Sequence, residues 1–148
     1  MKKYENLRLD NQLCFALYAA THSLTRAYRS ALERSGITYT QYLVMLVLWE
    51  GDNISVGTIA QRLELDSGTL TPMLKRLETA GFIKRTRNSN DERIVEISLT
   101  DAGNLLQHEI AKVQQGVACK TGLNPDQFTE LIDTLHRLVG TMSGGNNL

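Results

Sequence analysis

The chain has 148 residues, the length of one ordinary domain, and 42% of them are hydrophobic, which is enough for a core. Its 16 basic and 16 acidic residues cancel, so net charge alone points to neither a nucleic-acid nor a membrane partner. The longest apolar run, Leu43 to Trp49, is far shorter than the roughly 20 residues that span a bilayer. The N-terminus lacks the apolar segment of a secretory signal, so we expect a cytoplasmic location and no membrane partner.

Cysteines and histidines show no metal-binding pattern. The two cysteines, Cys14 and Cys119, are too far apart in the sequence for a zinc site, and the histidines at 22, 108 and 136 form no metal motif. We therefore expect no metal and no cofactor. Stable structural disulfides are also rare in the cytoplasm.

The N-terminal part of the chain predicts two helices. The first is capped by Asp10 or Asn11, carries leucines at helical spacing, and runs to about residue 34, just before Gly36. The second follows Thr38 and contains the apolar stretch 42–49.

Two further helices follow in close succession. Residues 56–63 predict a short helix, and the segment SGTLTPMLKRLETAG predicts the next, with Gly81 as its C-terminal stop. Pro72 leaves the start of this second helix open. Either the helix begins at Thr71 with the proline in its first turn, or a turn at 67–70 is loosely joined to it.

The hydrophobic period then changes from helical to alternating, which is typical of strands. Residues 82–87 and 94–99 predict two strands, and the polar residues 88–91 between them predict a turn. A helix, a tight turn, a second helix and a two-stranded hairpin occur in the order of a winged helix-turn-helix.

Two helices close the chain. Thr100 caps the first of them, and Asn124 caps the second, which is expected to end at Gly140. The fold class is therefore mainly α with a small β-hairpin wing, in a single domain. Its expected parts are a helical dimerisation region at about 10–35 and 100–140, a winged helix-turn-helix at about 38–99, and a flexible tail at 141–148.

The centre of the chain suits double-stranded DNA. A helix fits the major groove, where small polar side chains at its start can meet base edges, and an arginine on an exposed hairpin tip can enter a narrow minor groove. Residues 75–93 also carry a local excess of positive charge. The candidate DNA-binding residues are Ser67, Gly68, Thr69, Thr71, Lys75, Arg76, Arg87, Asp91 and Arg93.

Two simpler interpretations stay open for this region. The helix and hairpin could be an ordinary solvated surface, although the ordered succession of elements favours DNA. Asp91 could either hold Arg93 by a salt link or only shape the turn.

The residues of this region resemble a known family. The segment LDSGTLTPMLKRLETAGFIKRTRNSNDERIVEISLT resembles the recognition helix and wing of MarR-family regulators, including the D-x-R of the wing at Asp91 and Arg93. LDNQLCFALYAA and TYTQYLVMLVLWE resemble the organic hydroperoxide resistance regulators within that family. The match covers nearly all of residues 9 to 103 and is weaker in the C-terminal helices.

The resemblance implies a homodimeric repressor on a pseudo-palindromic operator, which releases DNA when an organic hydroperoxide oxidises its cysteine. In that subfamily two tyrosines of the other subunit hydrogen-bond the reactive cysteine, and the matching positions are Cys14, Tyr28 and Tyr39. The resemblance also gives Cys119 as the resolving thiol of a disulfide between subunits. A small-molecule thiol in that role, or an idle Cys119, are the alternatives.

Spacing supports a site shared between subunits. Cys14 is expected about one turn inside its helix, where the positive helix N-terminus favours a thiolate. In a continuous helix Tyr28 lies about 21 Å from Cys14, beyond a tyrosine's reach, so a bond between them needs a second chain or a break in the helix. On its own, Cys14 would more often be an inert core residue, and either tyrosine an aromatic at the edge of the core.

Three other functions compete with this one. A thiol peroxidase has no use for a basic wing, so we expect no enzyme. A MarR-type repressor released by a small aromatic ligand is the main alternative, and a protein-binding adaptor that never touches DNA is the weakest.

Overall fold

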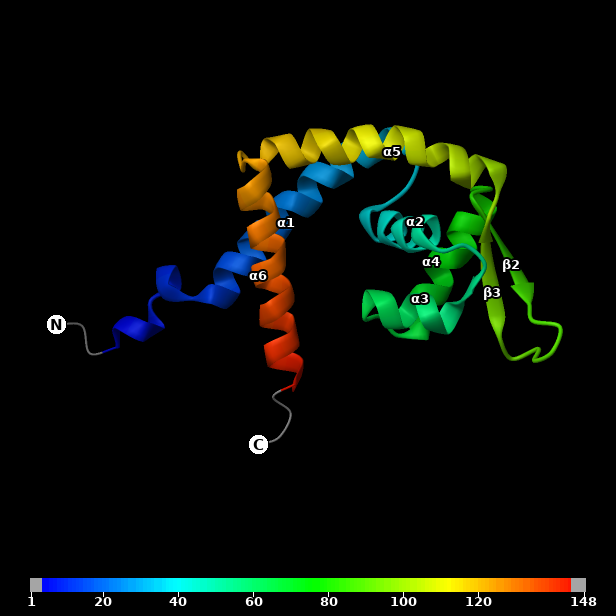
Figure 1. The fold of residues 1–148 in the computed structure, drawn as a ribbon, viewed down its shortest axis with the longest axis horizontal. Helices are drawn as coiled ribbons and strands as arrows, with labels where there is room; N and C mark the ends of the chain where they lie inside the picture. Colours follow the sequence, from blue (N-terminus) through cyan, green and yellow to red (C-terminus); the bar gives the residue numbers. More distant parts are fainter. Residues whose placement is uncertain (1–3, 145–148) are drawn as a thin grey trace. The chain divides into compact units, whose positions relative to one another are not determined.

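The computed structural model describes residues 4–144. The chain divides into two compact units, and the division falls between residues 114 and 115. Its helices and strands, with short 3-10 turns written η, follow the chain in one order. They are η1 Glu5–Leu7, η2 Leu9–Asn11, α1 Leu13–Leu32, η3 Glu33–Ser35, α2 Tyr39–Glu50, β1 Ile54–Ser55, α3 Val56–Leu63, α4 Ser67–Thr79, β2 Ile83–Arg87, β3 Val95–Leu99, α5 Asp101–Lys120 and α6 Pro125–Gly144. The predicted mainly α fold with a small β wing is confirmed (Figure 1).

The helix-turn-helix and wing are built on one core. Helices α2, α3 and α4 pack together, and the hairpin of β2 and β3 lies beside them (Figure 1). The core is apolar, and its fully buried members include Leu48 from α2, Ile59 from α3, Leu74 from α4 and Ile97 from β3. Because all these elements contribute to the same core, α4 and the hairpin are held at a fixed place on one body.

The wing has a third strand that the sequence pattern did not reveal. β3 lies between β2 and β1, with Arg87 opposite Val95 and Ile54 opposite Ile97, and all pairs are antiparallel. A strand of two residues is too short to show the alternation on which the prediction relied.

The predicted start of the first helix is wrong. α1 begins at Leu13, after two 3-10 turns, and Gln12 is its cap residue in an extended conformation. The side-chain amide of Gln12 donates to the backbone oxygens of Asn6 at 2.6 Å and Arg8 at 2.9 Å, so it holds the preceding turns instead of capping the helix. Asp10 lies in the second of these turns rather than at the cap.

Both interpretations of Pro72 are also wrong. α4 runs without interruption from Ser67, and Pro72 lies inside it. Proline removes one backbone hydrogen bond from a helix, here the bond to the oxygen of Gly68, which is exposed to solvent. The cost is reduced because water can reach that carbonyl.

The last helix is longer than predicted. Asn124 caps α6 as expected, with its side chain accepting from the backbone N–H of Gln127 at 2.9 Å. The helix passes Gly140, its predicted end, and continues to Gly144. Residues 141–144 of the predicted flexible tail are therefore helical, and 145–148 lie outside the described residues.

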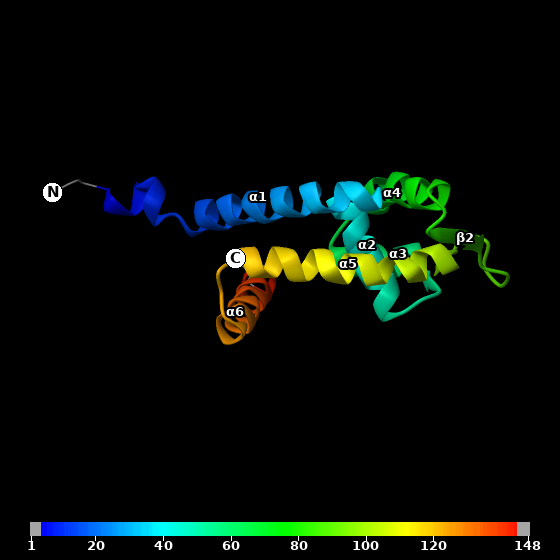
Figure 2. The ribbon, with the colours of Figure 1, turned by 90° about the horizontal axis from the view of Figure 1, so that it is seen from above.

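Helix α1 leads away from the α2–α4 group toward the N-terminus (Figures 1 and 2). Leu32 at its C-terminal end is fully buried, whereas Leu13, Tyr18 and Leu24 nearer its start are exposed. Leu13 and Leu24 lie on nearly the same side of the helix and Tyr18 on another, and exposed apolar side chains of this kind are typical of a surface that meets a partner.

Candidate DNA-binding face and sensor cysteine

The start of α4 is shaped by Asp66. Its carboxylate accepts from the backbone N–H of Thr69 at 2.7 Å and from the Thr69 hydroxyl at 2.8 Å. These hydrogen bonds hold the pKa of Asp66 below its ordinary value. Gly68 leaves room for this cap, because a Cβ there would lie 3.1 Å from the carboxylate. Ser67, Gly68 and Thr69 are all exposed at the helix start, where base edges could approach them.

Thr71 differs from its neighbours. It is only half-exposed, and its hydroxyl donates to the backbone oxygen of Ser67 at 2.7 Å. This bond uses the hydroxyl's one proton, so Thr71 retains only acceptor capacity toward DNA. Lys75 and Arg76, one to two turns further on, are exposed.

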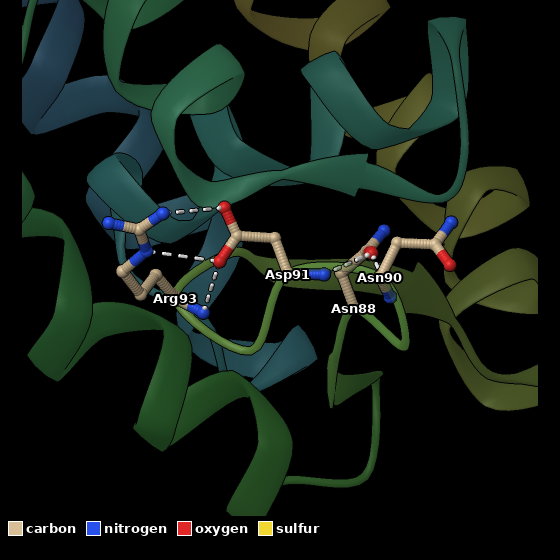
Figure 3. Close-up of polar contacts among 4 residues, drawn as sticks. All are labelled: Asn88, Asn90, Asp91 and Arg93. Atoms are coloured by element: carbon tan, nitrogen blue, oxygen red, sulfur yellow. Dashed lines mark hydrogen bonds and ion pairs between the residues drawn. The ribbon is translucent and has the colours of Figure 1, made fainter.

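The wing tip is organised by two side chains (Figure 3). The Asn88 side-chain oxygen accepts from the backbone N–H groups of Asn90 at 2.8 Å and Asp91 at 3.1 Å. Asp91 in turn accepts from both the backbone N–H and the side-chain Nε of Arg93, each at 3.1 Å. Of the two interpretations of Asp91, the salt link is present, and Asp91 also shapes the turn.

Arg93 is held but remains open to solvent. Its side chain is 91% exposed, against 38% for Asp91. A surface ion pair of this kind adds little stability, so its effect is mainly on the direction of the guanidinium. Arg87, at the end of β2, is also exposed.

One basic residue of this region is engaged in an ion pair within the chain. Arg85 donates through Nε to Glu78 at 2.7 Å, and both side chains are partly shielded from solvent. This pair joins β2 to α4, so Arg85 fixes the wing to the recognition helix. Among residues 4–144, Lys75, Arg76 and Arg87 form no ion pair.

Cys14 is the second residue of α1, closer to the helix start than predicted, and it is exposed. The first backbone bond of the helix runs from Ala16 to the oxygen of Gln12, and no side chain caps the helix. Uncapped N–H groups and the helix dipole favour an anion in the first turn.

Tyr28 and Tyr39 lie together in the same unit. Their ring centroids are 5.5 Å apart, so the chain brings these two predicted residues side by side. Cys14 is not with them, because α1 is one continuous helix from Leu13 to Leu32 and the rise over 14 residues is about 21 Å. Tyr39 also lines an open pocket of about 470 Å³ together with Arg29 and Thr38.

A third member of this aromatic cluster, Tyr42, was not among the residues predicted from the sequence. Its ring stacks on Tyr28 at 5.1 Å and lies 6.0 Å from Tyr39. Tyr39 and Tyr42 are three residues apart on α2, a spacing that places side chains on one helix face and could have revealed the cluster. Burial is the main cause that raises the pKa of Tyr39 and of Tyr42. Both hydroxyls therefore stay protonated and can donate a hydrogen bond.

Cys119 lies in the other compact unit, near the end of α5, and is exposed with a free thiol. Within residues 4–144 no cluster of His, Cys, Asp and Glu could hold a metal ion. Over the same residues no helix is long and apolar enough to cross a membrane.

Comparison with known proteins identifies the family. A family model described as the transcriptional regulator SarA/Rot matches residues 26–110. The organic hydroperoxide resistance transcriptional regulator of Bacillus subtilis is 40% identical over 97% of this chain and 98% of its own length. The regulator TtmR of Methylorubrum extorquens is 52% identical over 86% of this chain, which spans 65% of that relative's length.

Solved structures agree. AbfR of Staphylococcus epidermidis, reduced and bound to DNA, has a TM-score of 0.79 at 38% identity and covers 97% of this chain and 98% of its own. It has also been solved overoxidized and bound to DNA, with a TM-score of 0.75, and with a disulfide formed, with a TM-score of 0.68. MarR of Escherichia coli, at 25% identity over 86% of this chain and 96% of its own, has a TM-score of 0.71.

The relatives and the matched model are transcriptional regulators, not enzymes, and the fold is the winged helix-turn-helix of MarR. The chain belongs to the MarR/SarA family of DNA-binding transcriptional regulators.

Proposed function

We propose that this regulator is a homodimeric repressor that releases its operator when an organic hydroperoxide oxidises Cys14. The observation that carries the proposal is Cys14 itself, exposed in the uncapped first turn of α1. The chain is 40% identical to a hydroperoxide resistance regulator over nearly the full length of both chains, and this similarity supports the choice of oxidant.

The chemistry needs only the peroxide and two thiols. The Cys14 thiolate attacks the terminal peroxide oxygen, the O–O bond breaks, and the alcohol leaves with a proton, while the sulfur is oxidised to a sulfenic acid. The Cys119 thiol of the other subunit then condenses with the sulfenic acid, forming the disulfide and releasing water. AbfR, which has been solved with a disulfide formed, supports this second step.

The disulfide, rather than the added oxygen, is the proposed trigger. AbfR remains bound to DNA both reduced and overoxidized, so oxidation without a crosslink is compatible with binding in that relative. A disulfide requires Cα atoms within about 7 Å, which is a strong constraint between two subunits. Re-aiming the two recognition helices would spoil their spacing of about one DNA turn, roughly 34 Å.

Tyr28 and Tyr39 are the proposed donors to the partner's Cys14. Within one chain the continuous α1 keeps Cys14 away from Tyr28, so only a second subunit can complete the site. Tyr39 is half-buried and lines an open pocket, which supports an approach to it from outside its own chain. The exposed apolar side chains near the start of α1 form the surface by which the second copy would approach.

On DNA, the exposed residues at the start of α4 are proposed to read base edges in the major groove. Arg93, aimed by Asp91, is proposed to enter the minor groove, and Lys75, Arg76 and Arg87 to contact phosphates. Because the proposed dimer has two-fold symmetry, its operator should contain two matching half-sites arranged as a pseudo-palindrome.

Two cysteine variants test the function. Cys14→Ser should bind operator DNA nearly as tightly as wild type, since Cys14 lies outside the elements proposed to contact DNA, and should not respond to cumene hydroperoxide in a gel-shift assay. Cys119→Ser should gain one oxygen at Cys14 by intact mass, form no crosslinked dimer on a non-reducing gel, and remain on DNA. Release of Cys14→Ser at micromolar hydroperoxide would show the sensor assignment to be wrong.

A further inference from the structure

The tip of the wing has a side-chain anchor on β3. The side-chain Nδ2 of Asn88 donates to Oε1 of Glu96 at 2.6 Å, and the pair is partly shielded from solvent. Glu96 lies in the middle strand of the sheet, next to Ile97, which is fully buried in the core. The tip is therefore bonded to a strand that is itself fixed to the body of the unit.

Asparagine suits this place because its amide carries both a donor and an acceptor. While Nδ2 donates to Glu96, Oδ1 accepts from the backbone N–H groups of Asn90 at 2.8 Å and Asp91 at 3.1 Å. These roles cannot be exchanged, because a backbone N–H only donates and a carboxylate only accepts. An aspartate at residue 88 could accept the same two bonds from the turn but would repel Glu96.

The bonds form one continuous connection from β3 to Arg93. Glu96 holds the Asn88 amide, and the amide holds the backbone of Asp91. The Asp91 carboxylate then accepts from the backbone N–H and the Nε of Arg93 (Figure 3). Because the Arg93 side chain is 91% exposed, nothing else in the described chain restrains its direction so closely.

The negative charge of Glu96 also needs an explanation. A carboxylate in a DNA-binding wing is repelled by the phosphates, so it lowers affinity unless it has another effect. The hydrogen bond that Glu96 accepts from Asn88 supplies one, because a turn that is ordered before binding loses less conformational entropy on the complex.

We propose that Glu96 and Asn88 are positioning residues for DNA binding: their hydrogen bond fixes the direction in which the wing tip presents Arg93 to the minor groove. Both act through Asp91 and Arg93, and neither has to touch DNA. The inference rests on the proposed function, in which Arg93 enters the minor groove.

A matched pair of substitutions at residue 96 tests the anchor. Glu96→Gln keeps a side-chain oxygen that can accept from Asn88, whereas Glu96→Ala removes it, and both remove the same charge. Affinity is measured by fluorescence anisotropy with the full-length protein and a labelled duplex that the wild type selects from a random-sequence pool. Glu96→Ala should bind about threefold to fivefold more weakly than Glu96→Gln, the worth of one hydrogen bond.

Two backgrounds separate positioning from a general effect on the wing. In the Arg93→Ala background, Glu96→Gln and Glu96→Ala should bind equally, because no arginine is left to position. In the matched Lys75→Ala background, which removes a different basic residue and keeps Arg93, the difference of about threefold to fivefold should remain.

The outcomes that would overturn the inference differ from those that would overturn the function. If Arg93→Ala binds the duplex as tightly as wild type, the proposed role of Arg93 is wrong, and the inference falls with it. If Arg93→Ala weakens binding but the two variants at residue 96 bind equally, or if they differ by the same factor without Arg93, only the inference is wrong.

Discussion

The DNA-binding region and the start of α1 differ in where their contacts come from. The recognition helix and wing are held by bonds within the chain, such as Asp66 to Thr69 and Arg85 to Glu78. Cys14, by contrast, is exposed and forms no hydrogen bond with any side chain among residues 4–144. One region is complete in a single chain, whereas the other fits the proposal that Cys14 is half of a site that a second subunit completes.

The largest expected effect is a loss of stability caused by one substitution in the unit that contains the DNA-binding region. Gly103 is buried in the first turn of α5, and a Cβ there would overlap the backbone oxygen of Phe82, which cannot swing aside. Trp49 also donates to the Gly103 oxygen at 3.0 Å, so the helix cannot shift freely. Gly103→Ala should cost about 2–3 kcal/mol of unfolding free energy in a urea titration.

A matched glycine gives the control for that result. At Gly57 in α3 the nearest atom to a new Cβ is the Ser55 Oγ at 3.8 Å, an ordinary contact. Gly57→Ala should leave stability unchanged or raise it by up to about 1 kcal/mol, since alanine favours a helix. Equal stability of Gly103→Ala and wild type would contradict the close packing of α5 on the wing.

The next effect separates DNA binding from sensing. Arg93→Ala should weaken operator binding about tenfold and lower the salt slope by about one, while Cys14 oxidation stays at the wild-type rate. Asp91→Ala should weaken binding less, because the arginine remains but is no longer aimed. In the Arg93→Ala background it should have no further effect.

Fluorescence anisotropy over a salt series measures both quantities. Lys112→Ala, which removes a positive charge from α5, is the control for a general loss of charge. An Asp91→Ala effect that persists without Arg93 would show that Asp91 acts on DNA by another route.

The smallest expected effect is on the thermal stability that Asp66 gives by capping α4. The pKa of Asp66 lies below its ordinary value of 3.8 in the folded chain, so its ionised form stabilises the fold above about pH 4. That stabilisation is lost as pH falls through the lower folded pKa. Asp66→Asn keeps one side-chain oxygen that can accept from the backbone N–H of Thr69. It lacks the second carboxylate oxygen that accepts from the Thr69 hydroxyl, and it does not titrate. Its Tm should lie slightly below wild type at pH 7, and the gap should close as the pH falls through the folded pKa of Asp66.

Local rules allowed most of the fold to be predicted from the sequence. The alternation of Val95, Ile97 and Leu99 gave β3, and Thr100 and Asn124 mark the starts of α5 and α6 through their caps. The errors occur where a competing contact overrides such a rule. Gln12 turns its amide back onto the preceding carbonyls, which moves the start of α1. Pro72 lies inside α4 opposite Gly68, an exposed residue, where the lost backbone hydrogen bond costs least.

The candidate site was less accessible to sequence reasoning. Nothing in spacing or periodicity distinguishes Cys14 from a core cysteine, and its role rests on resemblance and on its exposed place in α1. Tyr42 was missed because a tyrosine in an apolar run reads as core. Its link to Tyr28 joins two different helices, α1 and α2, and such contacts leave no local pattern.

A mixed dimer tests the shared site most directly. One chain carries Cys14→Ser and the other Tyr28→Phe, with different affinity tags so that only the mixed dimer is isolated. If the thiol and the phenols come from different subunits, one site in this dimer is intact, and its single reactive Cys14 should be oxidised at the wild-type rate. Oxidation as slow as in the Tyr28→Phe homodimer would contradict a site built from two chains.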